Sequence, residues 1–104
     1  MSQIARTPEP PYYAVIAPAV LSTDVTGYPE MAARLMEVAK TIDGFLGIET
    51  CYQRGFAIAI SYWRSLEAID RWRQHAQHLR AKELGKTRWF DEYVTRIAKV
   101  ERAY

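Results

Sequence analysis

The chain has 104 residues, of which 49% are hydrophobic, and its 14 Lys and Arg against 12 Asp and Glu give a net charge of +2 with neutral histidines. This length fits one domain, the ordinary composition excludes bulk disorder, and scattered charges of both signs exclude the basic face of a nucleic-acid-binding protein. The single cysteine, Cys51, excludes an internal disulfide and a multi-cysteine zinc site, while the lack of a long apolar run or signal core leads us to expect a cytoplasmic protein with no membrane partner.

The beginning of the chain predicts an arm followed by a strand. Residues 1–11 contain three prolines and no periodicity, so we expect a flexible N-terminal arm before a single domain over residues 12–104. Residues 12–19 are apolar and β-prone, which predicts the first strand, and residues 22–27 form a polar loop.

A helix is predicted from Tyr28 onward. Pro29 suits the first turn of a helix, where a missing N–H costs nothing. Gly44 can adopt positive φ and end the helix. The apolar residues between them follow one helical stripe: Met31, Leu35, Val38 and Ile42.

Two strands joined by a tight turn follow. We expect strands over residues 45–52 and 56–63, with Gln53, Arg54 and Gly55 as the hairpin turn. On the second strand, one face carries Phe56, Ile58, Ile60 and Tyr62, and the other carries Ala57, Ala59, Ser61 and Trp63. The small residues of the latter face either admit a closely packed helix or leave space for something else.

The remaining chain predicts a second helix and a last strand. Ser65 is a suitable N-cap, and the helical composition continues through Glu83 until Gly85 breaks or kinks it. Residues 87–92 form a short amphipathic segment, and residues 93–101 form a strand whose alternation slips once, which predicts a bulge.

The order β-α-β-β-α-β predicts an α+β, ferredoxin-like fold with helices on one face of an antiparallel sheet. Apolar residues on both faces of residues 56–63 require a cover for the other face, and a second copy of the sheet would provide it. Aromatic residues make up 12% of the chain, more than one small core readily buries. We therefore expect a C2 homodimer or a ligand cavity.

Several segments resemble the antibiotic biosynthesis monooxygenase (ABM) domain family. They are residues 43–49 (DGFLGIE), residues 60–69 (ISYWRSLEAI), Trp72 and residues 78–82 (HLRAK), with residues 85–90 and 94–101 fitting one uncharacterised branch. The resemblance covers nearly all of residues 12–104. It implies a dimeric α+β barrel, in which two sheets face each other and each protomer has a pocket between sheet and helices.

Known members of that family include cofactor-free monooxygenases that form quinones and haem-degrading monooxygenases. The haem-degrading members use an asparagine on the first strand, a tryptophan on the second helix and a histidine beyond it. Trp72 matches the tryptophan, but residues 12–17 contain no asparagine and the histidine position falls near Ala76. Haem degradation is therefore not favoured.

The candidate site residues include both histidines. His75 and His78 are neighbours at i, i+3 on a helix. One of them can act as a base near neutral pH or as a haem ligand, or one bonds a helix end and the other is solvated. Trp72 shares a stripe with His75, so the pair can hold a flat aromatic ligand, or Trp72 is core packing. No third ligand accompanies the histidines, so no metal site is predicted.

Other candidates lie on the predicted sheet. Tyr62 can donate to a carbonyl or phenolate oxygen, or it is a core tyrosine with a satisfied hydroxyl. Glu49, if buried, needs a partner such as Arg54 or Arg96. Cys51 has no neighbour that activates a thiol. Trp89 with Phe90 and Tyr93 covers a pocket or lies at the dimer contact.

Two classes of function stay open. The first is a cofactor-independent monooxygenase that acts on a small aromatic or quinol substrate between sheet and helices, with His75, His78, Trp72 and Tyr62 as catalytic candidates and no cofactor or metal. The alternative is a non-catalytic or haem-binding dimeric module of the same fold.

Overall fold

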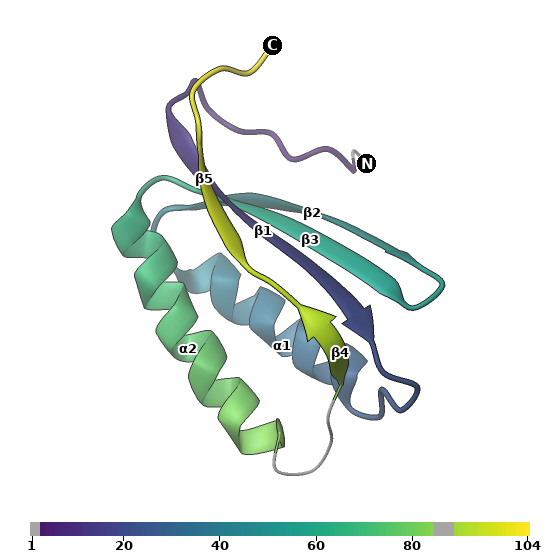
Figure 1. The fold of residues 1–104 in the computed structure, drawn as a ribbon. Helices are drawn as coiled ribbons and strands as arrows, with labels where there is room; N and C mark the ends of the chain where they lie inside the picture. Colours follow the sequence, from purple (N-terminus) through teal and green to yellow (C-terminus); the bar gives the residue numbers. More distant parts are fainter. Residues whose placement is uncertain (1–2, 85–88) are drawn as a thin grey trace.

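Two helices lie on one face of a five-stranded antiparallel sheet (Figure 1). This computed structural model describes residues 3–84 and 89–104, excluding the side chains of residues 78–84. The elements are β1 (Tyr12–Leu21), α1 (Tyr28–Thr41), β2 (Phe45–Gln53), β3 (Phe56–Trp63), α2 (Leu66–Leu84), β4 (Phe90–Tyr93) and β5 (Arg96–Val100). The predicted α+β, ferredoxin-like fold is confirmed.

The sheet is built around β1, which pairs with β3 along one edge and with β4 and β5 along the other. The prediction of one bulged strand over residues 93–101 is wrong, because β4 and β5 are separate strands. The gap lies opposite Pro18, whose carbonyl accepts a hydrogen bond from the Val94 amide at 3.3 Å. Proline has no N–H to donate in return, so the ladder is interrupted there.

The predicted hairpin turn and the predicted cap of α2 are confirmed, while α1 ends at Thr41, before Gly44, whose φ of 104° is positive as predicted. Arg54 and Gly55 have φ values of 52° and 81° at the tip of the β2–β3 hairpin, and positive φ at both central residues is typical of a type I′ turn. The Ser65 hydroxyl caps α2 by accepting the Ala68 amide at 3.1 Å. The predicted break at Gly85 lies outside the described residues.

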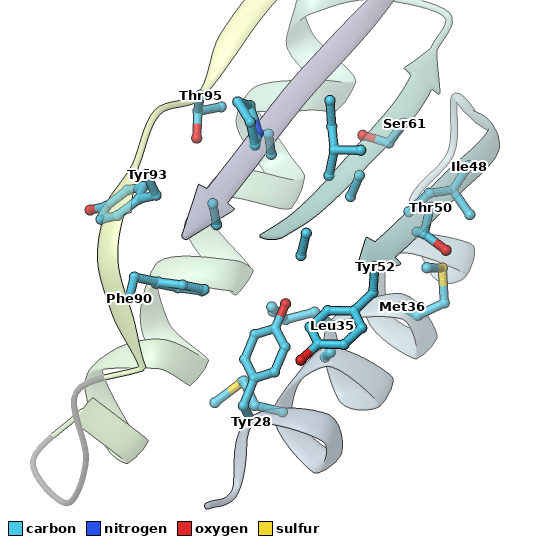
Figure 2. Close-up of a pocket in the computed structure, with 18 of the residues that line it drawn as sticks. Tyr28, Leu35, Met36, Ile48, Thr50, Tyr52, Ser61, Phe90, Tyr93 and Thr95 are labelled. Atoms are coloured by element: carbon cyan, nitrogen blue, oxygen red, sulfur yellow. The ribbon is translucent and has the colours of Figure 1, made fainter. Parts of the chain in front are cut away.

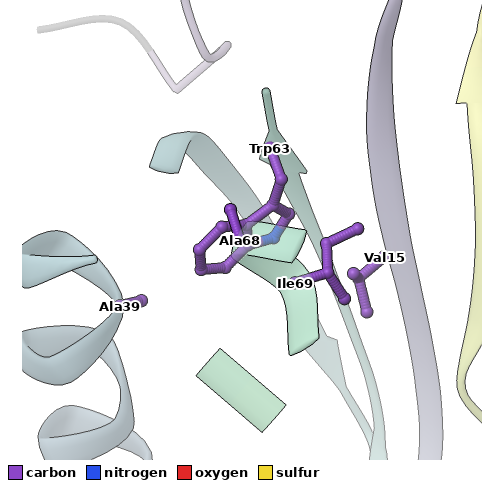
Figure 3. Close-up of a cluster of buried hydrophobic side chains, with 5 residues drawn as sticks. All are labelled: Val15, Ala39, Trp63, Ala68 and Ile69. Atoms are coloured by element: carbon purple, nitrogen blue, oxygen red, sulfur yellow. The ribbon is translucent and has the colours of Figure 1, made fainter. Parts of the chain in front are cut away.

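The main core lies between the sheet and α2 and includes the fully buried ring of Trp63 (Figure 3). This ring contacts Phe45, with centroids 5.2 Å apart, and Trp72, with centroids 5.6 Å apart. The buried cluster consists of Val15, Ala39, Trp63, Ala68 and Ile69. It attaches α2 to the middle of the sheet through large apolar contacts.

The sheet face away from the helices is apolar over β1 and β3. Strand alternation places there three directly paired sets of residues: Ile16 with Ile60, Pro18 with Ile58, and Val20 with Phe56. We call these six residues the outer apolar face. Phe56 is 47% exposed and Val20 is 38% exposed in the single chain.

The N-terminal segment packs beside the outer apolar face. The Ala5 amide donates to Glu49 Oε2 at 3.0 Å, and the hydroxyls of Thr7 and Tyr12 are hydrogen-bonded at 2.8 Å. A Cβ atom added at Gly47 would lie only 2.8 Å from the Ala5 Cβ. Within the described chain, neither helix is long and apolar enough to cross a membrane.

Candidate functional site

A cavity of about 770 Å³ lies between the helix-facing side of the sheet, α1 and β4 (Figure 2). Small side chains open this space on the sheet, where Ala17, Ala19, Ala57 and Ala59 line it. The face that carries small residues therefore leaves room for a cavity, which was one of the two predicted alternatives. The volume is within the range of small-molecule sites.

The walls of the cavity come from every layer of the fold. Helix α1 contributes Met31, Leu35 and Met36, and α2 contributes Trp72. Ile48 and Thr50 come from β2, Phe90 comes from β4, and Trp89 lies just before β4. The Trp72 indole N–H donates to the Leu35 carbonyl at 3.4 Å, which links α2 to α1. The lining is thus mostly apolar and rich in polarisable rings and thioethers.

Three tyrosines line the cavity: Tyr28 at the start of α1, Tyr52 near the end of β2 and Tyr93 at the end of β4. In Figure 2 the hydroxyls of Tyr28 and Tyr52 lie among the lining residues, whereas that of Tyr93 points away from them. Tyr52 is 64% exposed and Tyr93 is 61% exposed, so these two mark the solvent side of the cavity. No motif in the sequence singles out Tyr28 or Tyr52, and only the fold brings the start of α1 and the end of β2 to one cavity.

The ring of Tyr28 is held by an aromatic cluster. It contacts Phe90 edge-on at a centroid distance of 5.6 Å and Trp89 at 5.9 Å. The Trp89 indole N–H donates to the Thr26 carbonyl at 2.8 Å. Trp89, Phe90 and Tyr93 all line the cavity, which was one of the two predicted alternatives for them.

The loop before α1 supports this cluster. The Asp24 carboxylate accepts hydrogen bonds from the Thr26 hydroxyl at 2.7 Å and the Thr26 amide at 3.0 Å. These bonds hold the pKa of Asp24 below its usual value, and the bond from the hydroxyl has the larger effect. Gly27 follows with φ of 88°, and a Cβ there would lie 3.5 Å from the Trp89 ring.

The inner part of the cavity contains one buried polar side chain. Ser61 is 6% exposed, and its Oγ accepts the Trp63 indole N–H at 2.9 Å. The alternation of residues 56–63 predicts the correct face for Ser61, although no role is predicted for it. The signal was present, since a lone hydroxyl among alanines on an inward face requires a partner.

The described lining residues include no Asp, Glu, Lys, Arg or His. In the same part of the chain, no group of three or more His, Cys, Asp or Glu side chains is placed to hold a metal ion. The cavity wall that the structure describes is therefore electrically neutral, with hydroxyl groups as its main polar features.

The four predicted catalytic residues do not come together around this cavity. Trp72 lines it. His75 is exposed on α2 and is not among the described lining residues. The side chain of His78 lies outside the described residues. Tyr62 alternates with Ser61 and Trp63 and so lies on the opposite face of the sheet.

Tyr62 belongs to a polar cluster under the N-terminal segment. Its hydroxyl donates to Glu49 Oε1 at 2.6 Å, and its ring meets Tyr12 edge-on at 5.8 Å. Burial first, and then the hydrogen bond and negative charge of Glu49, raise the pKa of Tyr62 to about 12. Arg54 and Arg96 are the partners that the sequence offers to a buried Glu49; in the structure Glu49 is half-buried, and its carboxylate accepts from the Tyr62 phenol and the Ala5 amide instead.

Comparisons with known proteins agree with this architecture. The family model described as antibiotic biosynthesis monooxygenase matches residues 11–84. The chain is 47% identical over 103 residues to the uncharacterised protein YqjZ of Bacillus subtilis (strain 168), which covers 98% of this chain and 90% of that protein.

Two further relatives carry activities in their names. Jasmonate monooxygenase ABM of Pyricularia oryzae is 29% identical over 76 residues, which cover 70% of this chain but 35% of that protein. SnoaB of Streptomyces nogalater, a cofactor-independent oxygenase, is 15% identical and aligns over 88% of this chain and 95% of its own with a TM-score of 0.66. The structural likeness shows a shared fold.

Proposed function

The chain belongs to the antibiotic biosynthesis monooxygenase family, and on that premise we propose that it is a cofactor-independent monooxygenase of a small aromatic or quinol substrate. The observation that carries the proposal is the cavity of about 770 Å³, with its apolar lining and tyrosine hydroxyls. Such a cavity can hold a ring system away from water, which is the main task of the protein when the substrate supplies its own electrons.

The proposed reaction converts one phenol and one dioxygen into one quinone and one water. Loss of the phenol proton gives a carbanion that reduces dioxygen and forms a C–O bond at a ring carbon. The resulting hydroperoxide takes up a proton, its O–O bond breaks, and the same carbon loses its hydrogen to become a carbonyl. One oxygen atom stays in the quinone, and the other leaves as water.

Within this proposal, Trp72 forms part of the wall against which the substrate ring packs. Its place in the cavity lining supports that role. His75, His78 and Tyr62 stay candidates for proton transfer, each tested by its own substitution to Ala or, for tyrosine, Phe. An unchanged turnover in H75A, H78A or Y62F removes that residue from the mechanism.

Oxygen uptake tests the activity directly. Purified protein with a panel of hydroxynaphthalenes and naphthoquinols is expected to consume oxygen in proportion to enzyme, with the quinone detected by absorbance. W72A is expected to reduce kcat/KM by about 10- to 100-fold, since it removes a large part of the wall. No turnover above buffer across the panel would favour a non-catalytic binding module.

The haem-binding alternative has little support from the described cavity wall. Haem needs an axial ligand and cations for its propionates. The described lining has no histidine, lysine or arginine, so these residues do not fit haem. A Soret band that develops on titration with hemin and is lost in H78A, whose side chain lies outside the described residues, would revive this alternative.

The proposal also includes a homodimer that pairs through the outer apolar face. Support comes from the exposure of Phe56 and Val20 at 47% and 38% on a face that otherwise consists of Ile and Pro side chains. Pairing two such faces buries apolar area on both copies without the need for another protein.

A further inference from the structure

Ser61 is the only polar residue among the buried residues of the described chain. It lines the cavity, and its neighbours across the strands are Val15 and Ile48, which line it too. Figure 2 shows Ser61 on β3, at the other end of the group of lining residues from Tyr28. A hydroxyl at this depth is available only to a molecule inside the cavity.

The hydrogen bond from Trp63 determines what this hydroxyl can do. Because Ser61 Oγ accepts the indole N–H at 2.9 Å, one of its lone pairs is occupied. Its own hydrogen finds no acceptor among the hydrogen bonds of the described residues. An O–H group whose oxygen already accepts is a stronger donor. The fully buried Trp63 ring is held by Phe45 and Trp72, so this arrangement is rigid.

The surrounding wall determines which ligands can use this donor. No described lining residue carries a charge. A carboxylate that enters such a site loses its hydration free energy without gaining a countercharge. A carbonyl group loses much less hydration free energy and regains a hydrogen bond from the protein.

We propose that Ser61 is a ligand-binding residue whose hydroxyl donates to the carbonyl or phenol oxygen of a neutral ring compound, and that the site discriminates against carboxylates. The inference rests on the proposed function in taking this cavity as the substrate site. It adds that the substrate is uncharged and that the substrate oxygen lies at the Ser61 end of the cavity.

A matched pair of probes tests the donor. 1-Tetralone and tetralin share a ring system, but only the ketone has an acceptor oxygen. By calorimetric titration, S61A is expected to weaken binding of 1-tetralone by about 5- to 20-fold and to leave tetralin within about twofold. S61T keeps the hydroxyl and is expected to retain binding of the ketone. The control T41V removes a hydroxyl that donates to the Val38 carbonyl on α1, outside the described lining, and is expected to change neither affinity.

A second measurement covers the case in which S61A fails to fold, since this variant leaves the Trp63 N–H without its partner. The carbonyl stretch of 1-tetralone bound to the unmodified protein is expected at lower frequency than in hexane, because the oxygen accepts a hydrogen bond. An unshifted band, or an equal effect of S61A on both probes, overturns the role of Ser61 and leaves the oxygenase proposal standing.

A second pair of ligands tests whether the cavity prefers uncharged molecules. Methyl 1-naphthoate is expected to bind at least about tenfold more tightly than the 1-naphthoate anion at pH 7, and equal affinities overturn the neutral-ligand class. Ketone binding through Ser61 without any oxygen uptake would instead remove the oxygenase proposal and leave this inference intact. If no probe binds the unmodified protein, the cavity is not a site for such ligands and the inference falls.

Discussion

At the scale of single residues, burial and the contact with Glu49 together raise the pKa of Tyr62. The phenol donates to the carboxylate at 2.6 Å, and the second carboxylate oxygen accepts the Ala5 amide at 3.0 Å. Both carboxylate oxygens therefore have donors, and the ionised form is satisfied without an arginine. The cost falls on the ionised form of Tyr62, which would place a second negative charge beside Glu49.

We predict that Tyr62 ionises well above the usual pH range of a tyrosine. The rise in the pKa of Tyr62 from 10.0 to about 12 favours the neutral phenol in the folded state. Its contribution to stability is therefore present below pH 10 and is lost as the pH rises toward 12. Tyrosinate absorbance is expected to show a late step that Y62F lacks. A titration curve for Y62F that keeps this step would contradict the assignment.

At the scale of elements, two glycines with positive φ differ in what surrounds them. Gly44, with φ of 104°, lies where β2 begins, and a Cβ there would be 2.8 Å from the Ala68 Cβ of α2. Gly55, with φ of 81°, lies at the tip of the β2–β3 hairpin with nothing within 4 Å. The first position combines backbone strain with a close packing contact, and the second has only the strain.

G44A is therefore expected to destabilise the fold much more than G55A. We expect a loss of roughly 3 kcal/mol in the free energy of unfolding for G44A, from strain and overpacking together. G55A is expected to lose about 1 kcal/mol. Urea denaturation of both variants measures the difference. Equal losses would show that β2 and α2 are not packed this closely.

The contacts of the N-terminal segment with β2 lead to a separate prediction. Ala5 packs against Gly47, and the Ala5 amide is bound by Glu49, so G47A is expected to push the segment away while the sheet stays folded. Trypsin cleavage after the exposed Arg6 is expected to be about tenfold faster in G47A, because cleavage requires local release of the segment. G55A serves as the control. An unchanged cleavage rate in G47A would contradict the contact.

At the scale of the whole molecule, the two faces of the sheet differ in kind. One face carries the helices, the core and the cavity, while the other carries the outer apolar face beside the N-terminal segment. A face of this composition is best covered by a second copy, because each copy then covers the other.

Light scattering is expected to give twice the chain mass of 12.0 kDa at micromolar concentration. I58E places a carboxylate in the middle of the outer apolar face and is expected to weaken the dimer by at least about 100-fold, because the charge would be buried without a partner. L66E, at a residue that is 46% exposed at the start of α2, is the control and is expected to stay dimeric. A monomeric mass for the unmodified protein would refute the dimer.

The sequence by itself determined the order of the elements through α2 and most of their ends. Local signals suffice there: Gly44 follows α1, Gly55 closes the hairpin, Ser65 caps α2, and the alternation of residues 56–63 separates the two faces of β3. These features depend on backbone geometry and on neighbours in the chain, which a sequence displays directly.

Only the tertiary structure decided the composition of the cavity and the partners of the polar residues. Pro18 interrupts the ladder only because Val94, far along the chain, lies beside it. Tyr28 and Tyr52 join the cavity from different elements, and Glu49 finds Tyr62 and Ala5 rather than an arginine. Such contacts join residues distant in sequence, and no local pattern encodes which of several chemically suitable partners the packed fold brings within reach.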